Sequence, residues 1–152
     1  PRPHASAVLG ATAGEWIELD ALLAHYHALD SLGMSSGEAF DMGHTIGTRL
    51  HGQVLRTLLR LLGKLGTTPW AALGQAPKLW SRSWRGGGVM VDREGERHAV
   101  VRVVSSAMCR SPYYRAALTG AFCAGIQDLC RSPRSFVRAA SDTSFAFDLK
   151  WL

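Results

Sequence analysis

The sequence of 152 residues lacks the features of a membrane protein and of a secreted one. No apolar run reaches the roughly 20 residues of a membrane span, because Arg56 and Arg60 interrupt the most apolar stretch, 54–62. The first residues contain no basic start followed by an apolar block, so no signal peptide is expected. The three cysteines form no CxxC pair and are too few for a disulfide framework. We therefore expect free thiols and a cytoplasmic location.

The motifs of common enzyme classes are also missing. No Gly-x-Ser-x-Gly sequence presents a nucleophilic serine. The three glycines at 86–88 are followed by a strand pattern and by no GKS or GKT sequence, so they predict a flexible linker and not a phosphate-binding loop. The sequence therefore predicts a protein that is not an enzyme, without catalytic residues and without a metal site.

Acidic residues are few relative to basic ones, and the formal net charge is +5. Of the 17 basic residues 14 are arginines, which suit contacts to carboxylates and phosphates. They are spread singly along the chain without a basic run, which predicts a solvated basic surface, and nucleic acid is not the expected partner. The alternative is a nucleic-acid-binding domain, which would require Arg49, Arg56 and Arg60 to gather on one helical face.

What the sequence does have is enough apolar material for one core. Hydrophobic residues make up 47% of the chain and charged residues 19%, and the length suits a single domain. We expect a flexible N-terminal segment over 1–14 and one domain over 15–152. Apolar residues at spacings of three and four predict helices over 15–32 and 37–62, and a third from Pro69 to Arg85 that breaks near Gly74 and Pro77.

The second half of the chain changes period. β-branched residues predict a hairpin over 89–104 with its turn at 92–96, and alternating residues over 135–151 predict a second one. Between them, Ser111 is expected to cap a fourth helix that runs through Cys130. The order ααα-ββ-α-ββ predicts an α+β fold with helices packed on one face of a four-stranded antiparallel sheet.

Small residues mark two of the predicted helices. Gly43 and Gly47 are four residues apart and share one face of the second helix, where another backbone could approach closely. The fourth helix carries Gly120 and several alanines, which form a small-residue surface. A helix or a sheet is expected to pack closely there.

Several short motifs carry a resemblance over roughly 37–151. They are Gly43 and Gly47, Leu-Leu-Arg-Leu-Leu-Gly at 58–63, Trp-Arg-Gly-Gly-Gly at 84–88, Pro-Tyr-Tyr at 112–114, Gly-Ala-Phe-Cys-Ala-Gly at 120–125 and Phe-Asp-Leu-Lys-Trp at 147–151. With the order of elements, they resemble a paralogous family of uncharacterised myxobacterial proteins. That family is similar to a superfamily of ligand-binding domains: the four-vinyl-reductase type domain, the small subunits of the TRAPP complex and the haem-NO-binding domain.

The resemblance implies a sensory or adaptor domain, often a homodimer, that binds an apolar small molecule or a protein partner. The sequence departs from two patterns of the superfamily. Tyr113-Tyr114-Arg115 replaces the Tyr-x-Ser-x-Arg signature of the haem-NO-binding domains. The cysteine pair that four-vinyl-reductase type domains often carry near the C-terminus is missing from 139–147. A structural metal is therefore not expected there.

Two histidines offer an alternative function. His44 and His51 are seven residues apart on one helical face, and Gly47 between them would leave room for a flat ligand. Either could be an axial ligand of haem or another tetrapyrrole, although a helical histidine is more often a hydrogen-bonded residue at the edge of a core. His98, at the first hairpin, has no partner that the sequence identifies.

Aromatic residues could line a pocket between the third helix and the sheet, or fill the core. They are Trp70, Trp80, Trp84, Phe136, Phe145, Phe147 and Trp151, with the last four expected on one face of their hairpin. The candidate ligand-binding residues of the whole chain are His44, Gly47, His51, Trp80, Trp84, Tyr113 and Phe145.

Overall fold

The computed structural model describes residues 10, 16–50 and 68–152. Its helices are α2 (Leu19–Asp30), α3 (Ser36–Leu50), α5 (Pro69–Leu73), α6 (Ala76–Ser83), the 3₁₀ helix η1 (Ala107–Arg110) and α7 (Pro112–Ile126). Its strands are β1 (Gly88–Gly95), β2 (His98–Val104), β3 (Arg134–Ala140) and β4 (Phe145–Lys150). The predicted α+β class is confirmed, and the third helix is split as expected. The predicted helical segment beyond residue 50, and all of the segment 1–14 except Gly10, lie outside the described residues.

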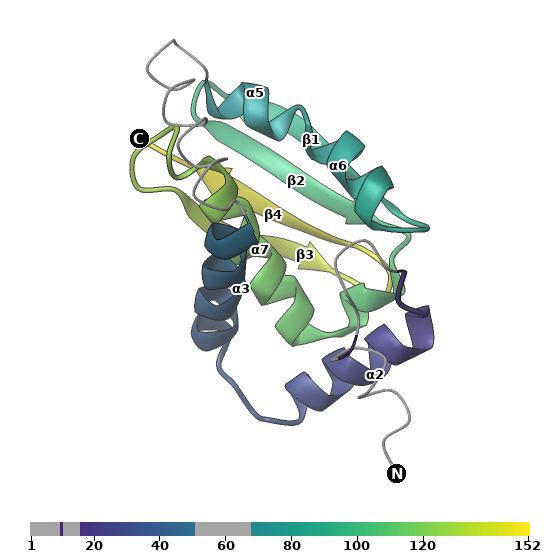
Figure 1. Cartoon of the computed structure of the whole chain (residues 1–152). Helices are drawn as coiled ribbons and strands as arrows, with labels where there is room; N and C mark the ends of the chain where they lie inside the picture. Colours follow the sequence, from purple (N-terminus) through teal and green to yellow (C-terminus); the bar gives the residue numbers. More distant parts are fainter. Residues whose placement is uncertain (1–9, 11–15, 51–67) are drawn as a thin grey trace.

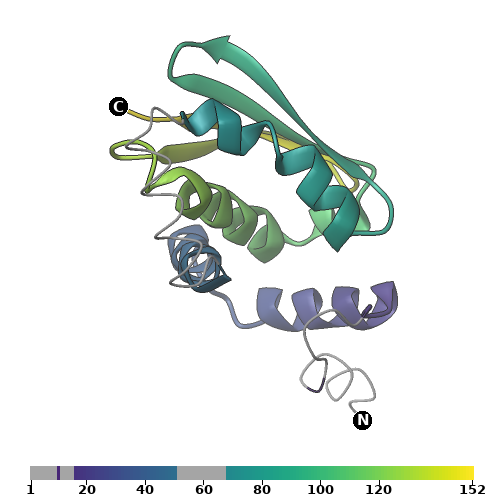
Figure 2. The same cartoon turned by 45° about the horizontal axis from the view of Figure 1, so that its top comes forward.

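The four strands form one antiparallel sheet in the order β1-β2-β4-β3. In the two central strands, side chains that point to the helical side are apolar and buried, as in the neighbouring pairs Val103–Phe145 and Val101–Phe147. Helices α5, α6 and α7 cover this side, whereas α2 and α3 lie beyond α7 and do not cover the sheet (Figures 1 and 2). The helices thus form two layers below one face.

Side-chain hydrogen bonds cap the first turns of two helices, α3 and α7, and the cap of α7 at Ser111 was predicted. Ser35 and Glu38 form a capping box at the start of α3: the Ser35 hydroxyl accepts from the backbone N–H of Glu38 at 3.2 Å, and the Glu38 carboxylate accepts from that of Ser35 at 2.8 Å. At α7, the Ser111 hydroxyl accepts from the backbone N–H of Tyr114 at 3.0 Å. The Asp30 carboxylate, at the end of α2, accepts from Ser111 and from the N–H of Tyr113, and so fastens α2 to α7.

Glycines bring α3 and α7 into backbone contact, as their spacing predicts. A Cβ atom placed on Gly43 would lie 1.8 Å from the carbonyl oxygen of Ala117, and one placed on Gly120 would lie 2.1 Å from that of Phe40. At Gly47 the neighbouring Cβ of Ala124 would be 3.0 Å away. The α3–α7 contact therefore requires glycine at positions 43 and 120, because any side chain there would clash with the backbone of the other helix.

Three predictions for the second half need correction. Strand β1 extends to Gly95 and Asp92 pairs with Val100, so the turn contains only Glu96 and Arg97. Helix α7 ends at Ile126, and Cys130 lies in the following turns. The three glycines at 86–88 have a structural role: Gly87 has φ +68° against the carbonyl of Val104, and Gly88 begins β1.

The predicted face of Phe136 is wrong. Phe136 pairs with Asp148, and the residues that point to the core from β4 are Phe145, Phe147 and Leu149. Phe136 therefore lies on the outer side of the sheet and is 58% exposed. Strand register decides this, because a shift of one residue moves a side chain to the opposite face.

Candidate functional site

An open groove of about 530 Å³ lies between α5–α6 and α7. Leu79, Trp80 and Trp84 line it from the α6 side, and Leu118 and Phe122 line it from α7. The volume falls within the usual range of small-molecule sites, about 300–1,000 Å³, and such sites are mostly apolar. The groove is the best candidate site among the described residues.

The two tryptophans of the groove belong to an aromatic cluster. The ring centroids of Trp80 and Trp84 are 5.6 Å apart, and Trp84 meets Tyr114 edge to face at 6.3 Å. Trp80 is only 6% exposed, and its Nε1–H is closed off from solvent without a hydrogen-bond partner among the described residues. The wall thus contains a buried donor that the surrounding protein leaves unsatisfied, which costs free energy.

The charged residues described at the groove are all basic. Lys78 and Arg82 both line it, and no aspartate or glutamate does so among the described residues. From the sequence, Lys78 and Arg82 were predicted to belong to a solvated basic surface. The signal that could have identified them is their spacing of four on a segment, 69–85, that contains no acidic residue.

The structure does not bring all seven candidate residues together. Trp80 and Trp84 lie in the groove. His44 and Gly47 lie on α3, where the His44 ring stacks on Phe40 with centroids 6.2 Å apart. His51 lies outside the described residues. The remaining two are Tyr113, which is part of a different cavity, and Phe145, which is part of the buried core.

The cavity beside Tyr113 is small, at about 90 Å³, and lies where α2, α3 and α7 meet. The Tyr113 ring lies 6.3 Å from that of Tyr26, which is partly buried. Burial, and then the neighbouring Tyr113, raises the pKa of Tyr26 to about 12. The tyrosine pair is therefore neutral at physiological pH and serves packing.

The three cysteines are all free, as predicted. Burial raises the pKa of the Cys109 and Cys123 thiols above the ordinary value, and that of Cys130 to about 11. Because the thiolate is the nucleophile, the raised pKa values keep these cysteines in the less nucleophilic thiol form at neutral pH.

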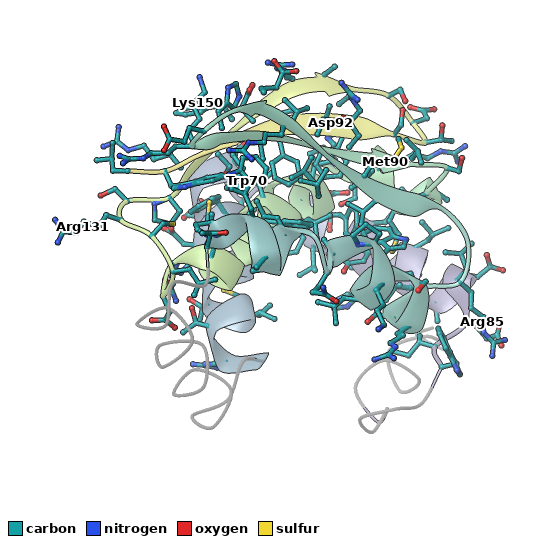
Figure 3. The ribbon with its side chains drawn as sticks, turned by 90° about the horizontal axis from the view of Figure 1, so that it is seen from above. Trp70, Arg85, Met90, Asp92, Arg131 and Lys150 are labelled. Atoms are coloured by element: carbon teal, nitrogen blue, oxygen red, sulfur yellow. The ribbon has the colours of Figure 1, made fainter. Side chains whose placement is uncertain are left out.

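The outer face of the sheet carries charged groups in contact. His98, which has no partner identifiable from the sequence, pairs with Asp148, and Arg138 donates to the same carboxylate at 3.0 Å. Arg138 also lies 3.7 Å from Glu94. Figure 3 shows Lys150 on this outer side and Trp70 on the helical side. These pairs neutralise several basic groups that a nucleic-acid-binding surface would leave free.

Basic residues elsewhere are also scattered. Arg85 and Arg131 lie at opposite ends of the molecule (Figure 3). Arg49 is exposed at the end of α3, and the two arginines expected beside it, Arg56 and Arg60, lie outside the described residues. The structure therefore describes no single arginine-lined face.

Replacing Asp148 by asparagine should destabilise the protein at neutral pH and much less in acid. Burial raises the pKa of Asp148, but the hydrogen bonds and charges of His98 and Arg138 outweigh burial and hold it below its ordinary value. A depressed carboxyl pKa stabilises the fold above the unfolded pKa, about 3.9, and that stabilisation is lost as the pH falls through the folded pKa. Urea unfolding of both proteins at several pH values measures the difference.

The control is Asp142→Asn, because that carboxylate is exposed and lies 3.8 Å from its nearest cation, Arg110. It should show little effect at any pH. A loss of stability for Asp148→Asn that is equal at neutral pH and below pH 3 would contradict the ionic role of Asp148.

Within residues 10, 16–50 and 68–152, no group of three or more histidine, cysteine, aspartate or glutamate side chains could hold a metal ion. None of the helices in this part of the chain has the length and apolar character of a membrane span.

Comparison with known proteins identifies the fold but no sequence family. No protein-family model matches the chain, and no curated protein sequence matches it. The chain is similar to a solved structure, the Fe(II) unliganded form of a mutant H-NOX protein from K. algicida. The TM-score is 0.65 at 12% identity, over 93% of this chain and 77% of that one. At this identity the likeness shows the fold alone, and it agrees with the haem-NO-binding part of the resemblance.

The described groove does not fit a haem iron. A haem iron requires an axial ligand such as histidine, cysteine, methionine or tyrosine. None of these residue types is among the side chains that line the described groove. His44, one of the two predicted axial ligands, is not a lining residue and faces Phe40 within α3.

Proposed function

We propose that this chain is a non-enzymatic sensory or adaptor domain that holds an apolar small molecule in the groove between α6 and α7. The observation that carries the proposal is the groove itself, which has the volume of a ligand site and exposes Trp84, Leu118 and Phe122. Leu79, in the same wall, is 58% exposed although it is apolar. A ligand there would remove this apolar surface from water, which stabilises the bound state by about 25 cal/mol per Å².

The chemistry of the remaining residues supports a binding function. The cysteine thiols have raised pKa values, and His98 and Asp148 lie on the opposite side of the sheet from the groove. The likeness to an H-NOX protein supports a sensor because the superfamily consists of ligand-binding domains. The cytoplasmic location and the homodimer stay predictions, as does a protein partner in place of the small molecule.

The test of the groove is binding of the neutral fluorescent probe N-phenyl-1-naphthylamine. Ala76 lines the groove at the start of α6, and Ala76→Phe should fill part of it and weaken binding at least about tenfold, or about 1.4 kcal/mol. Ala71→Phe introduces the same ring on the exposed side of α5, outside the groove, and should leave the affinity unchanged. Fluorescence titration of the three proteins measures the affinities.

A second variant protects the test against misfolding of Ala76→Phe. Leu79→Gln changes an exposed position of the groove and should weaken binding without loss of stability. If the unchanged protein does not bind the probe, or if neither groove variant weakens binding, the proposed site is wrong.

A haem or tetrapyrrole sensor is the second candidate function, and the fold likeness to an H-NOX protein favours it. It depends on His51, since His44 does not line the described groove. An absorbance spectrum of the freshly purified protein tests it: a Soret band that disappears in His51→Ala would make haem the ligand. A protein that is colourless as purified, and that leaves the spectrum of added hemin unchanged, would exclude this function.

A further inference from the structure

At the groove that we propose as the ligand site, two cations have no ion-pair partner among the described residues. Lys78 and Arg82 are four residues apart on α6 and both line the groove. Neither forms an ion pair with any residue that the structure describes. By contrast, arginines on the outer face of the sheet, such as Arg102 and Arg138, are paired with carboxylates.

This arrangement is mildly unfavourable in the absence of a negative charge. Residues at positions i and i+4 of a helix are neighbours, and two like charges there destabilise it. Helix α6 has eight residues and no acidic side chain that could offset the repulsion. A bound anion at this place would relieve the repulsion and accept hydrogen bonds from both side chains.

The apolar part of the groove and the cations are parts of one site. Trp80 comes from the same short helix as Lys78 and Arg82, Trp84 directly follows that helix, and all four line the same groove. From these observations we infer that the ligand is an amphipathic carboxylate: an apolar body against the tryptophans and Phe122, with its carboxylate between Lys78 and Arg82. This inference rests on the proposed function and names the class of its ligand.

The geometry suits a carboxylate for a further reason. The guanidinium group of arginine presents parallel N–H donors that match two carboxylate oxygens, and lysine adds a mobile charge. Both side chains are solvent-exposed, so salt screens their attraction and the gain is moderate. We expect the carboxylate to raise affinity about tenfold over an uncharged molecule with the same apolar body.

Two ligands of equal chain length test the inference: dodecanoate and 1-dodecanol, each below the concentration at which it aggregates. Their affinities are measured by titration calorimetry with the unchanged protein, at low and high salt. The variant Lys78→Gln/Arg82→Gln removes both cations. Its matched control, Arg134→Gln/Lys150→Gln, removes the same charge from exposed sheet positions that do not line the groove.

We expect dodecanoate to bind about tenfold more tightly than dodecanol at low salt, and the preference to fall at high salt. Lys78→Gln/Arg82→Gln should abolish the preference and keep dodecanol binding, whereas the control variant should retain it. Equal affinities of the two ligands for the unchanged protein, or a preference that survives in Lys78→Gln/Arg82→Gln, would overturn the carboxylate inference and leave the apolar site standing. If neither ligand binds, the proposed function itself fails.

Discussion

Gly43→Ala should destabilise the protein by at least about 3 kcal/mol, a large part of the stability of a domain of this size. The added methyl group would lie 1.8 Å from the carbonyl oxygen of Ala117, which is backbone and cannot rotate away. Helices α3 and α7 would have to separate and lose their packing. Urea unfolding followed by far-UV circular dichroism measures the change in the free energy of unfolding.

The control is Gly37→Ala in the same helix. A Cβ atom there has only the Ser35 hydroxyl near it, at 3.9 Å, so no clash occurs. Because alanine is a better helix former than glycine, this variant should be stabilised by about 0.5 kcal/mol. If Gly43→Ala were as stable as Gly37→Ala, the close contact of the two helices would be wrong.

A second pair of variants should differ almost as much. Phe147→Ala should cost about 3–5 kcal/mol, because Phe147 is fully buried and its ring lies against Phe122 at 5.4 Å and Phe145 at 5.6 Å. Phe136→Ala should change the free energy of unfolding by less than about 0.5 kcal/mol, since that ring is mostly exposed. Thermal and urea unfolding of both variants give the comparison.

The outcome also tests the strand register. Both residues are phenylalanines on neighbouring strands, and only the pairing of Phe136 with Asp148 and of Val137 with Phe147 places Phe136 outside. Equal losses of stability in the two variants would mean that both rings point to the core, and that β3 is displaced by one residue.

Local signals in the sequence predicted much of the fold. The capping box of Ser35 and Glu38, the cap at Ser111 and the small residues of the two helices were all identifiable, because each depends on residues close in the sequence. The glycines at 43 and 120 indicated a close contact, but only the structure shows that Gly43 meets Ala117 of α7 and Gly120 meets Phe40 of α3.

Features that depend on register or on distant partners were not predictable in the same way. The alternation of residues in β3 and β4 does not determine the register between the two strands. The predicted face of Phe136 was therefore wrong. His98 and Asp148 are 50 residues apart and meet only because β2 and β4 are neighbours. No spacing rule connects such a pair.

The candidate site was predictable only in part. Aromatic residues at helical and strand spacings indicated a core or a pocket, and the structure contains both: Phe145, Phe147 and Trp151 fill the core, Trp84 lines the groove, and Trp80 belongs to both. Which aromatic residues line the groove depends on the distance between α6 and α7, and the sequence pattern of a single helix does not give that distance. For the same reason, the sequence alone did not identify Lys78 and Arg82 as groove residues.

The glycine contact also has a mechanical consequence for the groove. Helix α7 forms one wall and is braced from behind by α3 at backbone distance, so that wall is stiff. The other wall is α6, a helix of eight residues that rests on β1 and is separated from α5 by Gly74 and Gln75. If the groove binds a ligand as proposed, we therefore expect ligands of different width to displace α6 and not α7, and any such displacement would act first on the edge strand β1, which α6 contacts.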